Sequence, residues 1–146
     1  MAGVLGEDQQ NRVGVVRDGF EAFDRGDLLW LQEHFSPDIM VRVPGSNRFS
    51  GVYSGVGQAI ALVAEAVAVL GGYSLRVLDV VGDQSVVAAT YMLTLRRLDG
   101  ESMQTLVTQL FSFSDDDRIQ ETWIEVEDEA AIDRFIGERA QVGGLE

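Results

Sequence analysis

The chain has 146 residues, of which 46% are hydrophobic, so it is long enough to bury one core without disulfides or metal ions. It contains no cysteine and one histidine, His34, which excludes disulfide frameworks, thiolate chemistry and histidine-rich metal sites. Its net charge of -13 argues against nucleic acids and anionic lipids as partners. We therefore expect one domain that uses no metal or cofactor and binds neither nucleic acid nor membrane.

The ends of the chain indicate its boundaries and its location. Residues 1–10 carry no basic stretch followed by an apolar one, so they are not typical of a secretory signal. We interpret them as a flexible leader of a cytoplasmic protein, followed by a single domain over residues 11–137 and a flexible tail over 138–146. The longest apolar run, residues 59–70, contains Glu65 and is shorter than the ~20 residues that cross a bilayer.

The first part of the sequence predicts two helices and a strand. Residues 13–23 repeat apolar side chains at three- and four-residue steps, which predicts a helix that Gly26 ends. Asp27 is placed to cap a short second helix that runs to Phe35. Residues 39–43 then alternate between apolar and other side chains, as a strand does.

The rest of the sequence predicts one more helix, then a run of strands. Residues 47–57 hold three glycines and read as a loop, and residues 60–70 have the period of a third helix. From residue 73 the period changes to two, and Asp128 is placed to cap a last helix. The expected strands cover residues 75–81, 86–98, 103–113 and 119–126. Helices followed by consecutive hairpins predict an α+β fold with an antiparallel meander, because parallel pairing would require crossovers.

The turn at Asp99-Gly100 sets the expected register of the central hairpin. If these two residues form the whole turn, Thr90 lies opposite Gln109 and Met92 lies opposite Val107. These side chains then share one face of the sheet.

A four-residue loop over Ser114 to Asp117 would add the last strand to the same face. Thr122 then lies opposite Gln109, and Ile124 lies opposite Val107. We choose this face as the pocket floor because the other face would bury two glutamates in a desolvated cavity. A slip of one residue would reverse the assignment of faces. The other face would carry Tyr91, Leu93, Leu106, Leu110, Glu121, Trp123 and Glu125.

Four short stretches, in this order, resemble the SnoaL-like and ketosteroid-isomerase-like branch of the nuclear transport factor two-like superfamily. They are Phe23-x-x-Gly26-Asp27, Phe35-Ser36-Pro37-Asp38, Ser50-Gly51 to Gly57-x-Ala59-Ile60, and Arg118-Ile119-x-Glu121-x-Trp123. The resemblance extends over residues 13–137. It implies a curved antiparallel sheet closed into a cone by helices (a cystatin-like roll), often as a homodimer. Members include isomerases, epoxide hydrolases, dehydratases, polyketide cyclases and proteins without known chemistry, so the fold does not decide the function.

The catalytic groups of these relatives are missing at the matching positions. The tyrosine, general-base aspartate and oxyanion-hole aspartate of the ketosteroid isomerases fall on Gly19, Val43 and Gln109. The histidine and aspartate of SnoaL-type cyclases fall on Thr122 and Ile124. We therefore expect a pocket without the usual acid and base pair.

Gln109 is the first candidate for a catalytic residue, because its neutral amide can donate a hydrogen bond to a substrate carbonyl. Thr90 and Thr122 are expected to lie on either side of it, on the two neighbouring strands. The alternative is that all three residues have only a structural role in packing. The candidate substrate-binding residues are Tyr53, Met92, Val107, Ile124, Phe20, Val43 and Arg48.

Three other features have a functional and a structural interpretation. Arg48 is placed to bind a substrate carboxylate or phosphate, or to be a solvated surface arginine. His34 is placed at a helix end, where backbone carbonyls or solvent satisfy it. Asp115 to Asp117 are interpreted as a polar hairpin loop, because consecutive turn residues rarely converge on one ion.

The sequence leaves several functions open. The first is a cyclase or isomerase of polyketide biosynthesis that folds a hydrophobic substrate, with a pericyclic, cycloaddition-type ring closure. The second is a binding or dimeric accessory protein without chemistry. A third restores epoxide-hydrolase-like or acid–base isomerase chemistry by turning Glu121 or Glu125 inward through a β-bulge.

Overall fold

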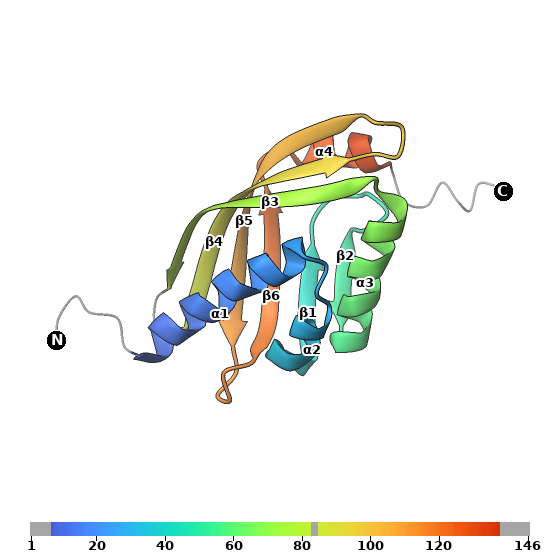
Figure 1. Cartoon of the computed structure of the whole chain (residues 1–146). Coiled ribbons are helices and arrows are strands. Elements are labelled where there is room, and N and C mark those ends of the chain that lie inside the picture. The colour runs from blue at the N-terminus through green and yellow to red at the C-terminus, as the bar shows by residue number, and fades with distance from the viewer. Residues whose placement is uncertain (1–6, 83–84, 138–146) are drawn as a thin grey trace.

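The computed structural model describes residues 7–82 and 85–137, and it is an α+β fold built on one curved, six-stranded sheet (Figure 1). The strands lie in the order β2-β1-β6-β5-β4-β3, and all neighbours are antiparallel except β1 and β6, which are parallel. The helices are α1 (Glu7–Asp24), α2 (Leu29–His34), α3 (Val56–Val69) and α4 (Glu129–Ile136). The strands are β1 (Phe35–Val43), β2 (Gly51–Ser54), β3 (Gly72–Gly82), β4 (Val86–Arg96), β5 (Ser102–Phe113) and β6 (Ile119–Val126).

Helix α1 crosses the concave face of the sheet, and its apolar side chains explain why (Figure 1). Val16 is 1% exposed, and the Phe20 ring lies 4.8 Å from the Tyr91 ring and 5.9 Å from the Phe111 ring. The last residue of the helix is Asp24, and Gly26 terminates it as predicted. The φ of Gly26, +75°, is a conformation that glycine adopts without strain. It begins at Glu7, before the expected domain boundary, while residues 1–6 and 138–146 lie outside the described residues.

Two local predictions for the first half were wrong. Asp27 does not cap α2: the N-cap is Leu28, and the Asp27 carboxylate lies 3.5 Å from Arg25. The segment read as a loop contains the edge strand β2, which pairs with β1. Four residues, one of them glycine, are too few for a periodic signal to predict a strand.

Both hairpin loops that flank β5 contain three residues. In the first, Arg97 N donates to Glu101 O (2.8 Å) and Gly100, at φ +94°, occupies the left-handed position. In the second, Ser114 N donates to Arg118 O (2.8 Å) and Asp117 adopts φ 63°. The predicted two-residue and four-residue loops were therefore each wrong by one residue. Asp115 to Asp117 form the polar turn that the sequence predicted.

The change of loop length shifts the pairing of the central strands. Tyr91 pairs with Val107 and Thr90 pairs with Thr108, one residue away from the predicted register. Between β5 and β6, the shorter loop shifts the register by one residue and a bulge shifts it by one more, so Gln109 pairs with Ile124 instead of Thr122. Because side chains alternate with a period of two, this total shift of two leaves Gln109 and Thr122 on the same face.

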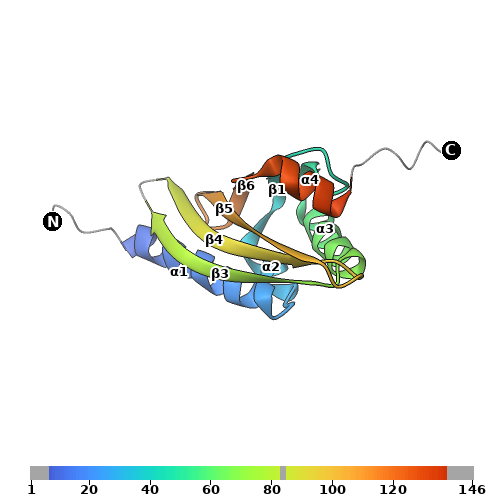
Figure 2. The same ribbon diagram turned by 90° about the horizontal axis from the view of Figure 1, so that it is seen from above.

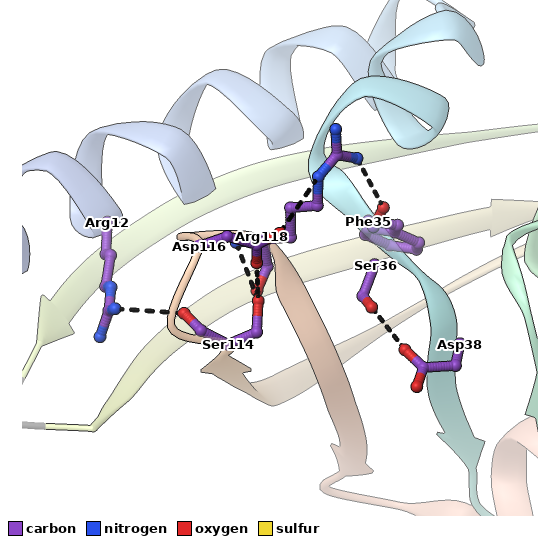
Figure 3. A network of polar contacts seen from close by, with 7 residues as sticks. All are labelled: Arg12, Phe35, Ser36, Asp38, Ser114, Asp116 and Arg118. Carbon is purple, nitrogen blue, oxygen red and sulfur yellow. Dashed lines mark hydrogen bonds and ion pairs between the residues drawn. The ribbon is translucent and has the colours of Figure 1, made fainter.

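Polar contacts join the tip of the β5–β6 hairpin to α1 and β1 (Figure 3). On α1, Arg12 forms an ion pair with Asp117 at 2.9 Å, and its guanidinium donates to the Ser114 carbonyl oxygen at 3.4 Å. Arg118 donates to the Phe35 carbonyl oxygen at 3.3 Å. These contacts hold together three elements that meet at one end of the sheet.

The C-terminal end of α3 and helix α4 lie near each other at another end of the sheet (Figures 1 and 2). Asp128 caps α4 as predicted, since its carboxylate accepts a hydrogen bond from Ala131 N at 3.0 Å. Further along α4, Asp133 accepts hydrogen bonds from Asn47 Nδ2 (2.9 Å) and from Ser46 N (3.1 Å). These bonds connect α4 to the loop between β1 and β2. Within the described ranges, no helix is both long and apolar enough to cross a bilayer.

We expect Asp133→Ala to lower the free energy of unfolding by about 1–3 kcal/mol, because Asn47, 2% exposed, would lose the acceptor of its amide. Partial burial acts to raise the pKa of Asp133, but the hydrogen bonds from Asn47 and Ser46 lower it overall. The carboxylate therefore stabilises the fold above its unfolded-state pKa, about 3.9, and this contribution is lost as the pH falls through the lower folded-state pKa. Urea unfolding at about pH 7 and about pH 3 measures both effects.

Asp133→Asn is the matched control, because its amide oxygen still accepts a hydrogen bond but does not titrate in this range. Equal acid sensitivity of the wild type and this variant would contradict the role of the carboxylate.

Candidate functional site

An inner cavity of about 140 Å³ lies between the concave face of the sheet and helices α1, α2 and α3. Aromatic and aliphatic side chains form most of its wall. Of the described residues, none that line it carries a carboxyl group. The lining includes Phe20, Trp30, Phe35, Ala59, Phe111 and Ile124.

Three polar side chains on neighbouring strands form a hydrogen-bonded chain at the wall of this cavity. The Tyr91 hydroxyl donates to Gln109 Oε1 at 2.7 Å, and Gln109 Nε2 donates to Thr122 Oγ1 at 2.8 Å. Tyr91 and Thr122 are 5% and 1% exposed, so water does not compete strongly for these bonds. We call these three residues the polar row.

The polar row gives the Gln109 amide a hydrogen-bond partner at its oxygen and at its nitrogen. Burial raises the pKa of the Tyr91 hydroxyl above its ordinary value, so this group remains a neutral donor. In this arrangement Oε1 accepts from the Tyr91 hydroxyl and Nε2 donates to the Thr122 hydroxyl. Among the described residues, the second N–H of Nε2 has no hydrogen-bond acceptor, and it remains available at the cavity wall.

The structure places four of the ten predicted site residues in the inner cavity and six outside it. Gln109, Thr122, Ile124 and Phe20 line the inner cavity. Val107 is fully buried in the core between the elements and does not line it.

The positions of Thr90 and Met92 were predicted wrongly. Thr90 pairs with Thr108 and Met92 pairs with Leu106, so both side chains lie on the convex face, away from the cavity. The one-residue change in the central hairpin turns Tyr91 inward instead. Sequence reasoning missed Tyr91 for this reason, although an Asp-Gly pair also fits the last two positions of a three-residue loop with glycine in the left-handed position.

The remaining predicted binding residues lie at other places. Val43 lines an adjoining, outer cavity. The Tyr53 hydroxyl donates to the Phe49 carbonyl oxygen at 2.8 Å, and its side chain lines a surface groove between β2 and α3. Arg48 is exposed and forms an ion pair with Glu65 at 3.2 Å, so neither residue reaches the inner cavity.

The groups that would restore acid–base chemistry do not face the cavity. Glu125 is exposed and pairs with Thr108 on the convex face, and Glu121 forms an ion pair with Arg42 at 2.9 Å. The bulge lies before Glu121 in the β5–β6 pairing and does not turn either carboxylate inward. The hypothesis of an inward glutamate was therefore wrong. His34 ends α2 as expected, with Nδ1 3.0 Å from the Trp30 carbonyl oxygen.

Comparison with known sequences identifies a family. The SnoaL-like domain matches residues 16–122. Uncharacterized proteins from Mycobacterium bovis and Mycobacterium tuberculosis are each 40% identical over 58 residues, which is 40% of this chain and 44% of theirs. The match therefore spans less than half the length of these curated relatives.

Solved structures share the fold at low sequence identity. Bal32a, from a soil-derived mobile gene cassette, is 23% identical with a TM-score of 0.84, over 90% of this chain and 100% of that one. A proposed SnoaL-like polyketide cyclase from Jannaschia sp. CCS1 is 17% identical with a TM-score of 0.76, over 90% and 96% of the two chains. IdmH from Streptomyces antibioticus, a proposed polyketide cyclase, is 19% identical with a TM-score of 0.66, over 80% and 91%. Since the family match extends over most of its length, this chain belongs to the SnoaL-like domain family.

Proposed function

We propose that this protein is a cyclase or isomerase that folds a hydrophobic, polyketide-like substrate in the inner cavity. Gln109 donates a hydrogen bond to a carbonyl oxygen of that substrate. The observation that carries the proposal is the polar row: Tyr91 and Thr122 hold the amide so that one N–H remains available at an otherwise apolar wall.

The available donor suits a substrate carbonyl better than a charged group. Buried polar groups need partners, and a neutral N–H in an apolar cavity is satisfied by an uncharged acceptor at little desolvation cost. A substrate carboxylate or ammonium would lose its hydration without a counter-charge, since none of the described lining residues is charged at neutral pH.

The cavity is suited to reactions that do not require a protein base. A cycloaddition-type ring closure makes and breaks bonds within the substrate and transfers no proton to the protein. Holding the reacting carbons close together lowers the barrier by several kcal/mol, and the hydrogen bond at the carbonyl stabilises charge that develops there. Resemblance to proposed polyketide cyclases supports the substrate class.

Binding and conversion are tested with defined ketones. Calorimetric titration should show tighter binding of hexanophenone than of hexylbenzene, which replaces the carbonyl by a methylene, because only the ketone accepts from Gln109. Incubation of a linear aryl ketone that carries a conjugated diene and an alkene conjugated to its carbonyl should show faster ring closure with the protein than without it, as measured by chromatographic separation of the linear and cyclic isomers. Equal affinity for ketone and hydrocarbon, with no acceleration, would refute the proposal.

A carrier of hydrophobic ligands is a second candidate, because the inner cavity presents no carboxylate or histidine among its described lining residues. Such a protein would retain an apolar ligand through purification. Native mass spectrometry would detect the added mass, and a ligand that is kept but never converted favours the carrier over the cyclase.

A further inference from the structure

We infer that the substrate is elongated, with its carbonyl-bearing part in the inner cavity and an uncharged hydrocarbon chain in the outer cavity. This inference rests on the proposed function, because the position of the carbonyl follows from the polar row. It adds a second binding subsite, which defines the shape and the polarity of the substrate.

The outer cavity, about 180 Å³ in volume, adjoins the inner one. Five residues line both cavities and form a collar between them. These collar residues are Phe23, Leu62, Leu75, Tyr91 and Ile124. Four of them are hydrocarbon side chains, and the hydroxyl of the fifth, Tyr91, is already bonded to Gln109. A chain that leaves the polar row through the collar therefore remains in apolar surroundings.

The chemistry of the outer cavity indicates its occupant. Its wall between α3 and β4 is the apolar cluster of Phe49, Leu70 and Leu95, all 6% exposed. The charged residues among its described lining are Glu129 and Asp133, both acidic and both on α4. A terminal carboxylate or phosphate would be repelled there, whereas a hydrocarbon chain gains from burial. The occupant is thus a chain without a terminal anion, and the apolar wall favours an alkyl or polyene chain.

The outer cavity lies toward α4, at the end of the sheet away from the tip of the β5–β6 hairpin (Figure 1). At the other end, the hairpin tip is held to α1 and to the start of β1 by Arg12 and Arg118 (Figure 3). Phe35, whose carbonyl oxygen accepts from Arg118, lines the inner cavity. A ligand anchored at Gln109 therefore extends past Ile124 toward α4.

A series of phenyl ketones tests the length of the substrate. Acetophenone, hexanophenone and decanophenone carry the same carbonyl and differ only in their chains. For the wild-type protein we expect roughly three- to fourfold tighter binding per buried methylene, as measured by calorimetry, until the outer cavity is filled. No gain from acetophenone to hexanophenone would overturn the inference.

Two substitutions on α3 provide a matched pair, because Ala59 lines only the inner cavity and Ala66 lines only the outer one. Ala66→Phe should remove the gain from chain length and leave the affinity for acetophenone within about twofold of the wild type. Ala59→Phe should weaken the binding of all three ketones. Retention of the full gain in Ala66→Phe would overturn the inference.

The folding of both variants is checked by circular dichroism. If Ala59→Phe does not fold, the wild-type series still tests whether the hydrocarbon chain binds in the outer cavity. The comparison of hexanophenone with hexylbenzene separates the two proposals. A preference for the ketone without a gain from chain length refutes the second subsite and leaves the carbonyl site in place. A gain from chain length without a preference for the ketone refutes the role of Gln109.

Discussion

Replacement of Gln109 by leucine is expected to slow ring closure by about two to three orders of magnitude, the range observed when one donor to a developing oxyanion is removed. Leucine fills a similar space but cannot donate to the carbonyl. It also leaves the Tyr91 hydroxyl and Thr122 Oγ1 without their partner. Single-turnover measurements with the linear aryl ketone that carries the diene and the conjugated alkene report the chemical step.

Two variants separate the hydrogen bond from general packing. Thr90→Val is the matched control, since Thr90 lies on the strand next to Gln109 but on the convex face, and its rate should equal that of the wild type. Tyr91→Phe removes only the donor to Oε1, so the amide can turn its oxygen toward the cavity. We expect a loss of about fivefold to tenfold, because a net hydrogen bond contributes about 1 kcal/mol. A rate for Gln109→Leu within twofold of Thr90→Val would contradict the proposed role.

The sequence predicted most of the fold because its helices and long strands repeat apolar residues over many positions. Helix α1 and strand β5 each present several buried side chains on one face, and the caps at Gly26 and Asp128 are local signals. Strand β2 was missed because it is short and owes its pairing to β1, which is distant in sequence. Tertiary pairing of this kind leaves no period to detect.

The candidate site was predicted only in part, since it depends on the exact length of two loops. One extra residue in the loop at Asp99 exchanged Thr90 for Tyr91 in the cavity wall. In the next hairpin a loop error and a bulge compensated each other, so Thr122 kept its predicted face. An Asp-Gly pair indicates a hairpin but fits loops of two or three residues. The local sequence therefore could not decide the register of β4 and β5.

Two glycines in α1, Gly14 and Gly19, should respond to alanine substitution with opposite changes in the free energy of unfolding. At Gly19, an added Cβ would lie 2.5 Å from the nearest atom of the Trp30 indole, whereas at Gly14 it would meet nothing within 4 Å. Glycine lowers helix stability at both positions by roughly 1 kcal/mol relative to alanine. We therefore expect Gly14→Ala to stabilise the protein by about 0.5–1 kcal/mol, as measured by urea unfolding.

Gly19→Ala should instead destabilise the protein by about 1–3 kcal/mol, because overpacking of the Trp30 ring outweighs the gain in helix propensity. The indole cannot move away freely, since its ring stacks on His34 at 4.4 Å and also contacts Phe35. Trp30 lines the inner cavity, so its displacement should weaken the binding of acetophenone as well.

A double substitution shows whether the clash with Trp30 is the cause. Trp30→Leu removes the ring, so Gly19→Ala in that background should stabilise the protein as much as Gly14→Ala does. If Gly19→Ala remained destabilising without the indole, the close approach of α1 and α2 would not explain the requirement for glycine. The lack of a side chain at Gly19 lets Trp30 form part of the cavity wall.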